Sequence, residues 1–251
     1  MNGYHFTSDT LGNGKAIPPI GEWLEYDPSE TIAPGLYASE HPLDALKQAP
    51  GAHPVSDPDA LKPAPRARLH RVELEGELEA GGNPINRHIG QRRKILASID
   101  ATELLWEFAR WCALRVIDLW DAPKVVREYL ETGDESLQEE AWATARAARE
   151  GGEARPTWDI GAAETAEWAA ARKKGGPVEQ AARKAARSVE WEATARAARE
   201  APAEEWAAAW IGAGAEAEQV QRQKFASMVE VAFAAQANDE QNPTPSPGSR
   251  R

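Results

Sequence analysis

Apolar and polar residues alternate along several short stretches in the first hundred positions of the chain. The clearest stretch is 69–78, where Val72, Leu74 and Leu78 share one face and charged residues take the other. A period of two predicts a β-strand with one buried face and one solvated face. Shorter β-prone or apolar stretches, separated by proline and glycine, lie at 4–7, 22–26, 35–39 and 95–99.

The spacing of apolar residues changes to three and four after residue 100. A helix with a continuous buried stripe is predicted from this period. The stripe consists of Leu105, Phe108, Cys112, Val116 and Leu119. The four residues before it, Asp-Ala-Thr-Glu at 100–103, have the form of a capping box, which is typical of a helix start.

Further helices follow, and glycine and proline indicate where they end. A second capping box, Ser-Leu-Gln-Glu at 136–139, predicts the start of a helix that stops at Gly151. The segments 175–177 and 201–202 interrupt the later helices. We expect the last helix to run over about 203–237.

These patterns predict an α+β protein in four parts. Residues 1–100 form a β-rich N-terminal domain with a small mixed β-sheet, and 101–133 form core helices that pack on it. Residues 134–237 form a helical region rich in tryptophan and in alanine, which is the best helix former. The polar composition of 238–251, with proline, serine and glycine, predicts a disordered tail.

The sequence ATARAARE occurs twice in the helical region, at 143–150 and at 193–200. Repeats on this length scale are typical of stacked helical units that bury their apolar faces on each other. Drift within a low-complexity segment of alanine, arginine and glutamate would give the same pattern. Both interpretations stay open at this point.

The composition limits which binding partners and which cellular location we expect. The formal net charge is −11, from 40 acidic and 29 basic side chains, so nucleic acid is not expected as a partner. No stretch approaches the ~20 apolar residues of a membrane span. The N-terminus lacks the basic start and apolar core of a secretory signal, and the single cysteine excludes an internal disulfide. We therefore expect a cytoplasmic protein with no membrane contact.

Few patterns in the sequence suggest a metal site or a catalytic centre. The histidines show no paired ligand spacing, so we expect them at surface or loop positions and expect no metal. They are His5, His41, His53, His70 and His88. Neither a phosphate-binding P-loop nor a G-x-S-x-G motif is present. Cys112 falls on the buried stripe, where burial raises a thiol pKa and favours a packing role over a nucleophilic one.

Residues 32–50 and 68–78 resemble part of the ADP-ribosyltransferase fold. The resemblance rests on a Gly-apolar-Tyr strand, a serine, a short helix, a loop and a Val-Glu-Leu strand. It implies that Tyr37 would stack on nicotinamide, that Ser39 would lie in the same NAD-binding segment, and that His5 would lie beside the NAD ribose. The family's glutamate has no counterpart on the late strand, so the main stabiliser of an oxocarbenium-like transition state is missing.

The chain is more similar, over about residues 1–140, to a family of bacteriophage-encoded proteins of unassigned activity. The similarity lies in short motifs and in an alanine- and tryptophan-rich helical tail. The motifs include GLYAS at 35–39, PLDAL at 42–46, HRVEL at 70–74, FARWCAL at 108–114 and YLETGDESL at 129–137. This resemblance implies a phage origin and a setting inside a bacterial host cell, and it supplies no reaction.

Tryptophan is concentrated in the helical half of the chain, where six residues are spread through alanine-rich sequence. They are Trp142, Trp158, Trp168, Trp191, Trp206 and Trp210. One interpretation is that they fill gaps between closely packed helices. The other is that they form a partner-binding or self-association surface, because tryptophan is enriched in binding hot spots.

Three functional hypotheses follow. The first is a phage-encoded binding protein that acts on a host or defence protein through protein–protein contact, with no cofactor; a homo-oligomer stays open. The second is an ADP-ribosyltransferase-like enzyme, or an inactive nucleotide-binding relative, with NAD as its ligand. The third is a structural or assembly component of the phage particle.

Overall fold

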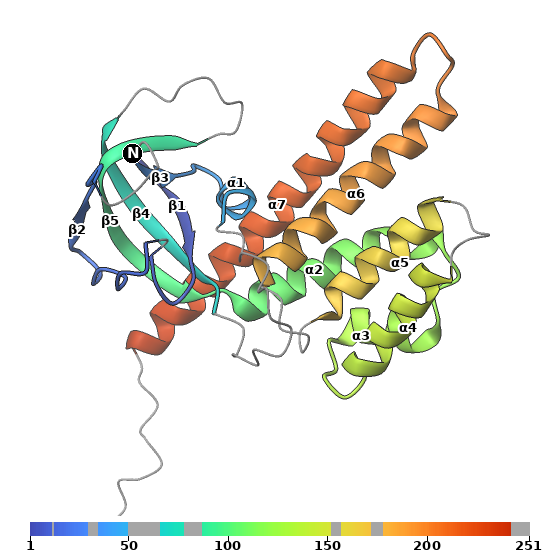
Figure 1. The fold of residues 1–251 in the computed structure, drawn as a ribbon, viewed down its shortest axis with the longest axis horizontal. Helices are drawn as coiled ribbons and strands as arrows, with labels where there is room; N and C mark the ends of the chain where they lie inside the picture. The colour runs from blue at the N-terminus through green and yellow to red at the C-terminus, as the bar shows by residue number, and fades with distance from the viewer. Residues whose placement is uncertain are drawn as a thin grey trace, which may run out of the picture.

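The computed structural model describes residues 1–11, 13–29, 35–49, 66–77, 87–151, 157–171 and 178–241. A strongly curled β-sheet forms the N-terminal part, and a mainly helical region follows (Figure 1). This arrangement confirms the α+β class. No helix among these residues is long and apolar enough to cross a lipid bilayer.

The sheet has five strands in the order β1-β4-β5-β2, with β3 paired to β5 beside β2. Every strand pairing is antiparallel, so the prediction of a mixed sheet is wrong. The strands β4 and β5 are consecutive in the chain and pair side by side, which requires the chain to reverse. The strands are β1 (Asn2–Thr7), β2 (Trp23–Glu25), β3 (Leu36–Ala38), β4 (Arg68–Glu77) and β5 (His88–Asp100).

The strand β5 is much longer than the apolar stretch 95–99 that predicts it. The first half of β5 is polar, and its basic side chains lie opposite acidic side chains of β4. Arg92 pairs with Glu75, and Lys94 pairs with Glu73. These cross-strand ion pairs stabilise the strand where apolar alternation is missing, which is why hydrophobic periodicity alone does not reveal it.

The sheet curls until its two ends meet. Tyr4 of β1 and Ser39, just after β3, exchange two backbone hydrogen bonds of 2.7 and 3.0 Å. A Cβ atom at Gly3 would lie 2.6 Å from the Ser39 carbonyl oxygen, so only glycine allows this approach. The strands therefore enclose an interior in the manner of a small barrel.

Helices cover one side of the sheet and extend away from it. The short helix α1 lies between β3 and β4, and α6 and α7 form a long hairpin whose tip projects beyond the other helices (Figure 1). The later part of α7 passes beside the sheet, where Arg71 of β4 contacts Phe233 and Glu230. The helices are α1 (Pro42–Lys47), α2 (Thr102–Val116), the 3-10 turn η1 (Ile117–Leu119), α3 (Lys124–Thr132), α4 (Gln138–Glu150), α5 (Thr157–Ala169), α6 (Val178–Glu200) and α7 (Trp206–Gln241).

Helix boundaries differ from the predicted ones in three places. The residue that caps α2 is Ala101, and Asp100 remains the last residue of β5 while its side chain accepts a hydrogen bond from the Thr102 N–H. The cap of α4 is Leu137, without a side-chain bond. The helix α7 continues to Gln241, into the segment predicted to be disordered.

The predicted stripe is confirmed on α2 as the centre of the helical core, but its last member, Leu119, lies in η1 and is only partly buried. Leu105, Phe108 and Cys112 are fully buried, and Val116 nearly so. Phe108 packs against Phe225 of α7, with 4.7 Å between the ring centroids. Since most surrounding residues are alanine, which buries little area, these large side chains carry much of the packing energy.

The repeated sequence does not form a repeated packing unit. Ala145 in the first copy is buried, whereas its counterpart Ala195 is partly exposed. Both copies place Arg and Glu four residues apart, and the pairs Arg146–Glu150 and Arg196–Glu200 form on the helix surface. The structure favours low-complexity drift over stacked repeats.

We expect Phe225→Ala to lower the free energy of unfolding by about 3–5 kcal/mol, because it removes a fully buried ring between α2 and α7. Urea unfolding followed by circular dichroism measures this change. Val231→Ala on the same helix is the control; that side chain is 68% exposed, and we expect a change within about 0.5 kcal/mol. A loss below about 1 kcal/mol for Phe225→Ala would show that the ring is not a core contact.

Candidate functional site

The structure brings together the three candidate residues of the N-terminal domain. His5, Tyr37 and Ser39 line one cavity of about 80 Å³. We call it the Tyr37 cavity; its other lining residues are Tyr4, Phe6, Ala38, Ala45, Gln48 and Arg87. Closure of the sheet creates it, because the β1–Ser39 pairing places the first strand beside the third.

The cavity is small and carries no acid. Ligand pockets for drug-sized molecules hold about 300–1,000 Å³, so a dinucleotide does not fit in the cavity as it stands. No carboxylate is among its described lining residues. The described lining therefore offers no carboxylate that could stabilise positive charge on a ribose.

Two guanidinium groups lie at the Tyr37 cavity, that of Arg87 in its lining and that of Arg93 next to Tyr37. The guanidinium of Arg87 lies over the Tyr37 ring, 4.6 Å from its centroid. Arg93 is buried behind the wall, donates a 2.8 Å hydrogen bond to the Tyr37 carbonyl oxygen, and has its pKa lowered to about 10 by burial. Burial lowers the pKa of His5 well below its usual value, and the neighbouring Arg93 and His70 lower it further.

His70 lies in the barrel interior, so the expectation of a surface or loop position is wrong for this histidine. Val72 and Leu74, which lie two and four residues further along β4 and beyond a bulge, are buried as well. Thr7 Oγ1 lies 2.8 Å from His70 Nε2 and 3.0 Å from the Ser8 carbonyl oxygen. His70 Nδ1 is buried and has no hydrogen-bond partner among the described residues.

Sequence reasoning missed three of the residues around this cavity. His70 belongs to the alternating stretch of β4, and that alternation is the signal that could have placed it inside. Arg93 lies in the polar first half of β5, which carries no such signal. Arg87 immediately precedes β5 and carries no comparable signal.

The described residues contain no group of three or more histidine, cysteine, aspartate or glutamate side chains that could hold a metal ion. Cys112 is fully buried, and burial raises its thiol pKa far above the usual value, as expected of a packing residue. His53 lies outside the described residues.

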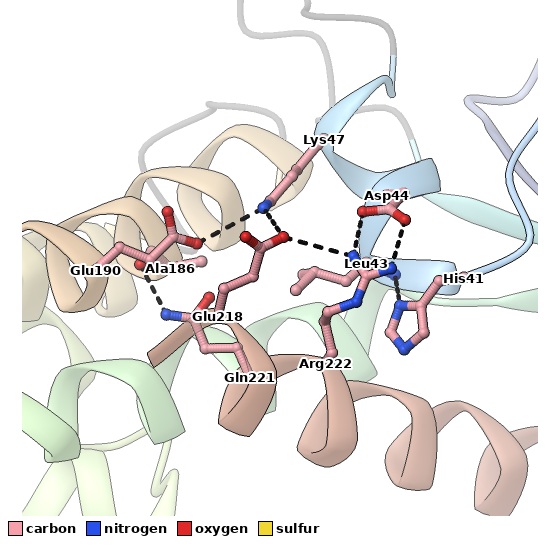
Figure 2. Close-up of polar contacts among 9 residues, drawn as sticks. All are labelled: His41, Leu43, Asp44, Lys47, Ala186, Glu190, Glu218, Gln221 and Arg222. Atoms are coloured by element: carbon pink, nitrogen blue, oxygen red, sulfur yellow. Dashed lines mark hydrogen bonds and ion pairs between the residues drawn. The ribbon is translucent and has the colours of Figure 1, made fainter. Parts of the chain in front are cut away.

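A second polar cluster joins α1 to the base of the α6–α7 hairpin (Figure 2). Asp44, from the PLDAL motif, receives two hydrogen bonds of 2.6 and 2.7 Å from the Arg222 guanidinium. Lys47 pairs with Glu218 at 2.8 Å and with Glu190 at 3.7 Å. Every titratable group in this cluster has a partner, so its chemistry is attachment of the hairpin to the N-terminal domain.

The tryptophans of the helical region divide into two groups. Trp142 and Trp168 are half-buried against the core, as the packing interpretation predicts. Trp191 and Trp206 are 60% and 52% exposed. Both pack edge-to-face on Trp210, with ring centroids 5.2 and 6.3 Å apart. The side chain of Trp158 lies outside the described residues.

The exposed tryptophans also differ from the others in their cationic neighbours. Several half-buried tryptophans have a lysine or arginine of this chain over the ring: Trp23, Trp111, Trp142 and Trp168. Within the described part of the chain, no cation lies over Trp191, Trp206 or Trp210. The charged residues that immediately precede Trp206, Glu204 and Glu205, are acidic and exposed.

A search of protein families, of curated proteins and of solved structures finds no match for this chain.

We expect the Asp44–Arg222 pair to be strongly coupled. Asp44 is almost fully buried, so Arg222→Gln removes the ion partner of a buried carboxylate and should lower the free energy of unfolding by about 3 kcal/mol. Asp44→Asn should also destabilise, but the double variant should lose less than the sum of the two single losses. A double-mutant cycle by urea unfolding measures the coupling, and strict additivity would contradict it.

We expect stability to fall in mild acid because of His70. Burial, with Arg93 and Arg68 nearby, lowers its folded pKa to about 4, from about 6.5 in the unfolded chain. Between these pH values only the unfolded state binds the proton. The contribution of neutral His70 to the free energy of unfolding is therefore complete above pH ~6.5 and is lost as pH falls towards ~4. The loss from this residue is roughly 3 kcal/mol. Urea unfolding at several pH values should show a flatter profile for His70→Gln; identical profiles would contradict the assignment.

Proposed function

We propose that this chain is a protein-binding protein whose contact surface is the tip of the α6–α7 hairpin. We call this surface the aromatic tip and define it by Trp191, Trp206, Trp210, Ile211 and the adjoining acids Glu204 and Glu205. The observation that carries the proposal is a cluster of three tryptophans, two of them more than half exposed, on a part of the fold that projects from the body (Figure 1).

Exposure of these side chains has an energetic cost that a partner would remove. Ile211, in the turn of helix after Trp210, is 71% exposed. Burying apolar area stabilises by about 25 cal/mol per Å², and tryptophan is among the residues that contribute most at interfaces. The rings hold one another in a fixed edge-to-face arrangement, so less side-chain freedom is lost on binding.

The chemistry of the tip favours a basic partner. On the α7 side of the tip, residues 203–217 carry acidic charges and no basic ones. On the α6 side the basic residues are Arg196, which pairs with Glu200, and Arg199. Among the described residues, no cation lies over these three tryptophans, whereas one lies over each of the half-buried Trp23, Trp111, Trp142 and Trp168. Arginine or lysine from another protein would supply both the cation–π contact and the complementary charge.

The likeness to phage proteins supports one choice of partner. If the chain acts inside an infected bacterium, the basic surface would belong to a host or defence protein. Nothing in this proposal requires a cofactor or a reaction.

Calorimetric titration with a short synthetic peptide that alternates arginine and leucine tests the proposal. We expect saturable binding that weakens about tenfold or more in the double variant Trp191→Ala, Trp206→Ala, because two hot-spot side chains are lost. The double variant Glu204→Gln, Glu205→Gln should also weaken binding. A peptide that alternates glutamate and leucine should not bind.

The matched control is Glu139→Gln, Glu140→Gln, which removes the same charge from an exposed pair on α4 and should leave binding unchanged. Absence of saturable binding, or equal weakening in the control, would overturn the basic-partner proposal. Sedimentation velocity provides a second check. A dimer that the tryptophan variants dissociate would show that a second copy occupies the tip.

A further inference from the structure

We propose that the Tyr37 cavity is a binding site for a small tetrahedral oxyanion, with Arg87 as its ion partner. The site is separate from the aromatic tip, and the proposal does not depend on the protein-binding function.

Uncompensated positive charge is the main argument. Neither Arg87 nor Arg93 forms a salt bridge, within 4.0 Å, with a described carboxylate. Arg93 is buried, and its described hydrogen-bond partner is the backbone carbonyl of Tyr37, a residue that lines the cavity. A buried cation without a counter-ion is costly. An anion in the cavity would reduce that cost, in a chain whose net charge of −11 otherwise disfavours anions.

Hydrogen-bond donors converge on the same space. Ser39 is almost fully buried and its Oγ accepts a 2.9 Å hydrogen bond from Gln48 Nε2, which leaves the hydroxyl proton of Ser39 available. No described group accepts that proton or contacts the ring nitrogens of His5. Arg87, Ser39 and His5 together offer charged and neutral donors to one ligand, which is the arrangement that oxyanions require.

The size and lining of the cavity select the ligand class. At about 80 Å³ it accommodates a phosphate or sulfate group and excludes a nucleoside. The absence of a carboxylate from its described lining excludes a cation as the natural occupant. Free phosphate and the phosphoryl end of a larger molecule share this chemistry.

Calorimetric titration of the full chain with inorganic phosphate, at neutral pH and low ionic strength, tests the site. We expect saturable binding at one site and about a tenfold or greater loss of affinity for Arg87→Gln, since a charge-assisted contact is removed. Arg92→Gln is the matched control. It removes the same charge from the exposed side of β5, where Arg92 pairs with Glu75, and should change affinity less than about twofold.

Nuclear magnetic resonance of the His5 ring gives a second readout that does not depend on heat. Phosphate should shift the His5 ring signals of the original chain and should not shift those of Arg87→Gln. Binding of methyl phosphate as well would indicate the phosphoryl end of a larger molecule, and its exclusion would indicate the free anion. No saturable binding, equal loss in both arginine variants, or acetate binding as tightly as phosphate would overturn the proposal.

Discussion

The alanine-rich helices can approach one another closely but gain little from doing so, and this constraint governs the whole structure. Alanine faces bury small areas, so a few large or ionic side chains decide where the helices lie. Phe225 fixes α7 against α2, and Arg222, one turn earlier, fixes it against Asp44 of α1 (Figure 2). Gln221 adds a buried hydrogen bond of 3.0 Å to the Ala186 carbonyl. Three neighbouring residues of α7 thus attach the hairpin at its base.

Towards its tip the hairpin carries no comparable attachment among the described residues. From Gln221 towards the tip the α7 residues are mostly alanine and glycine; Trp206 and Ile211 there are exposed, and Trp210 is half-buried. Tryptophans that served only to pack the bundle would resemble Trp142 and Trp168, which are half-buried and lie beside cations of the chain itself. This contrast between base and tip supports the proposed binding role of the tip, whereas the sequence alone left both a packing role and a binding role open.

The parts of the fold that sequence could predict are those with local causes. Short strands bounded by glycine and proline, the buried stripe of α2, and the left-handed Gly133 that ends α3 all follow from a few adjacent residues. The first half of β5 could not be predicted, because acids on another strand stabilise it. His70 and Arg93 were missed for a related reason. Only closure of the sheet turns one face of a strand into an enclosed interior, and closure depends on the distant pair Tyr4 and Ser39.

The same closure explains why this acidic chain contains a positive cavity. Glu73 and Glu75 of β4 lie on the outer face of the sheet, where they pair with Lys94 and Arg92 of β5. The inner face receives Arg93 together with His5 and His70, whose lowered pKa values keep these two histidines neutral. Tyr4 connects this region to the hairpin, since it lines the cavity and its hydroxyl donates to Glu230 of α7. One continuous helix of 36 residues therefore carries the aromatic tip at one end and contacts the cavity wall near the other, so the two candidate sites share a single rigid element.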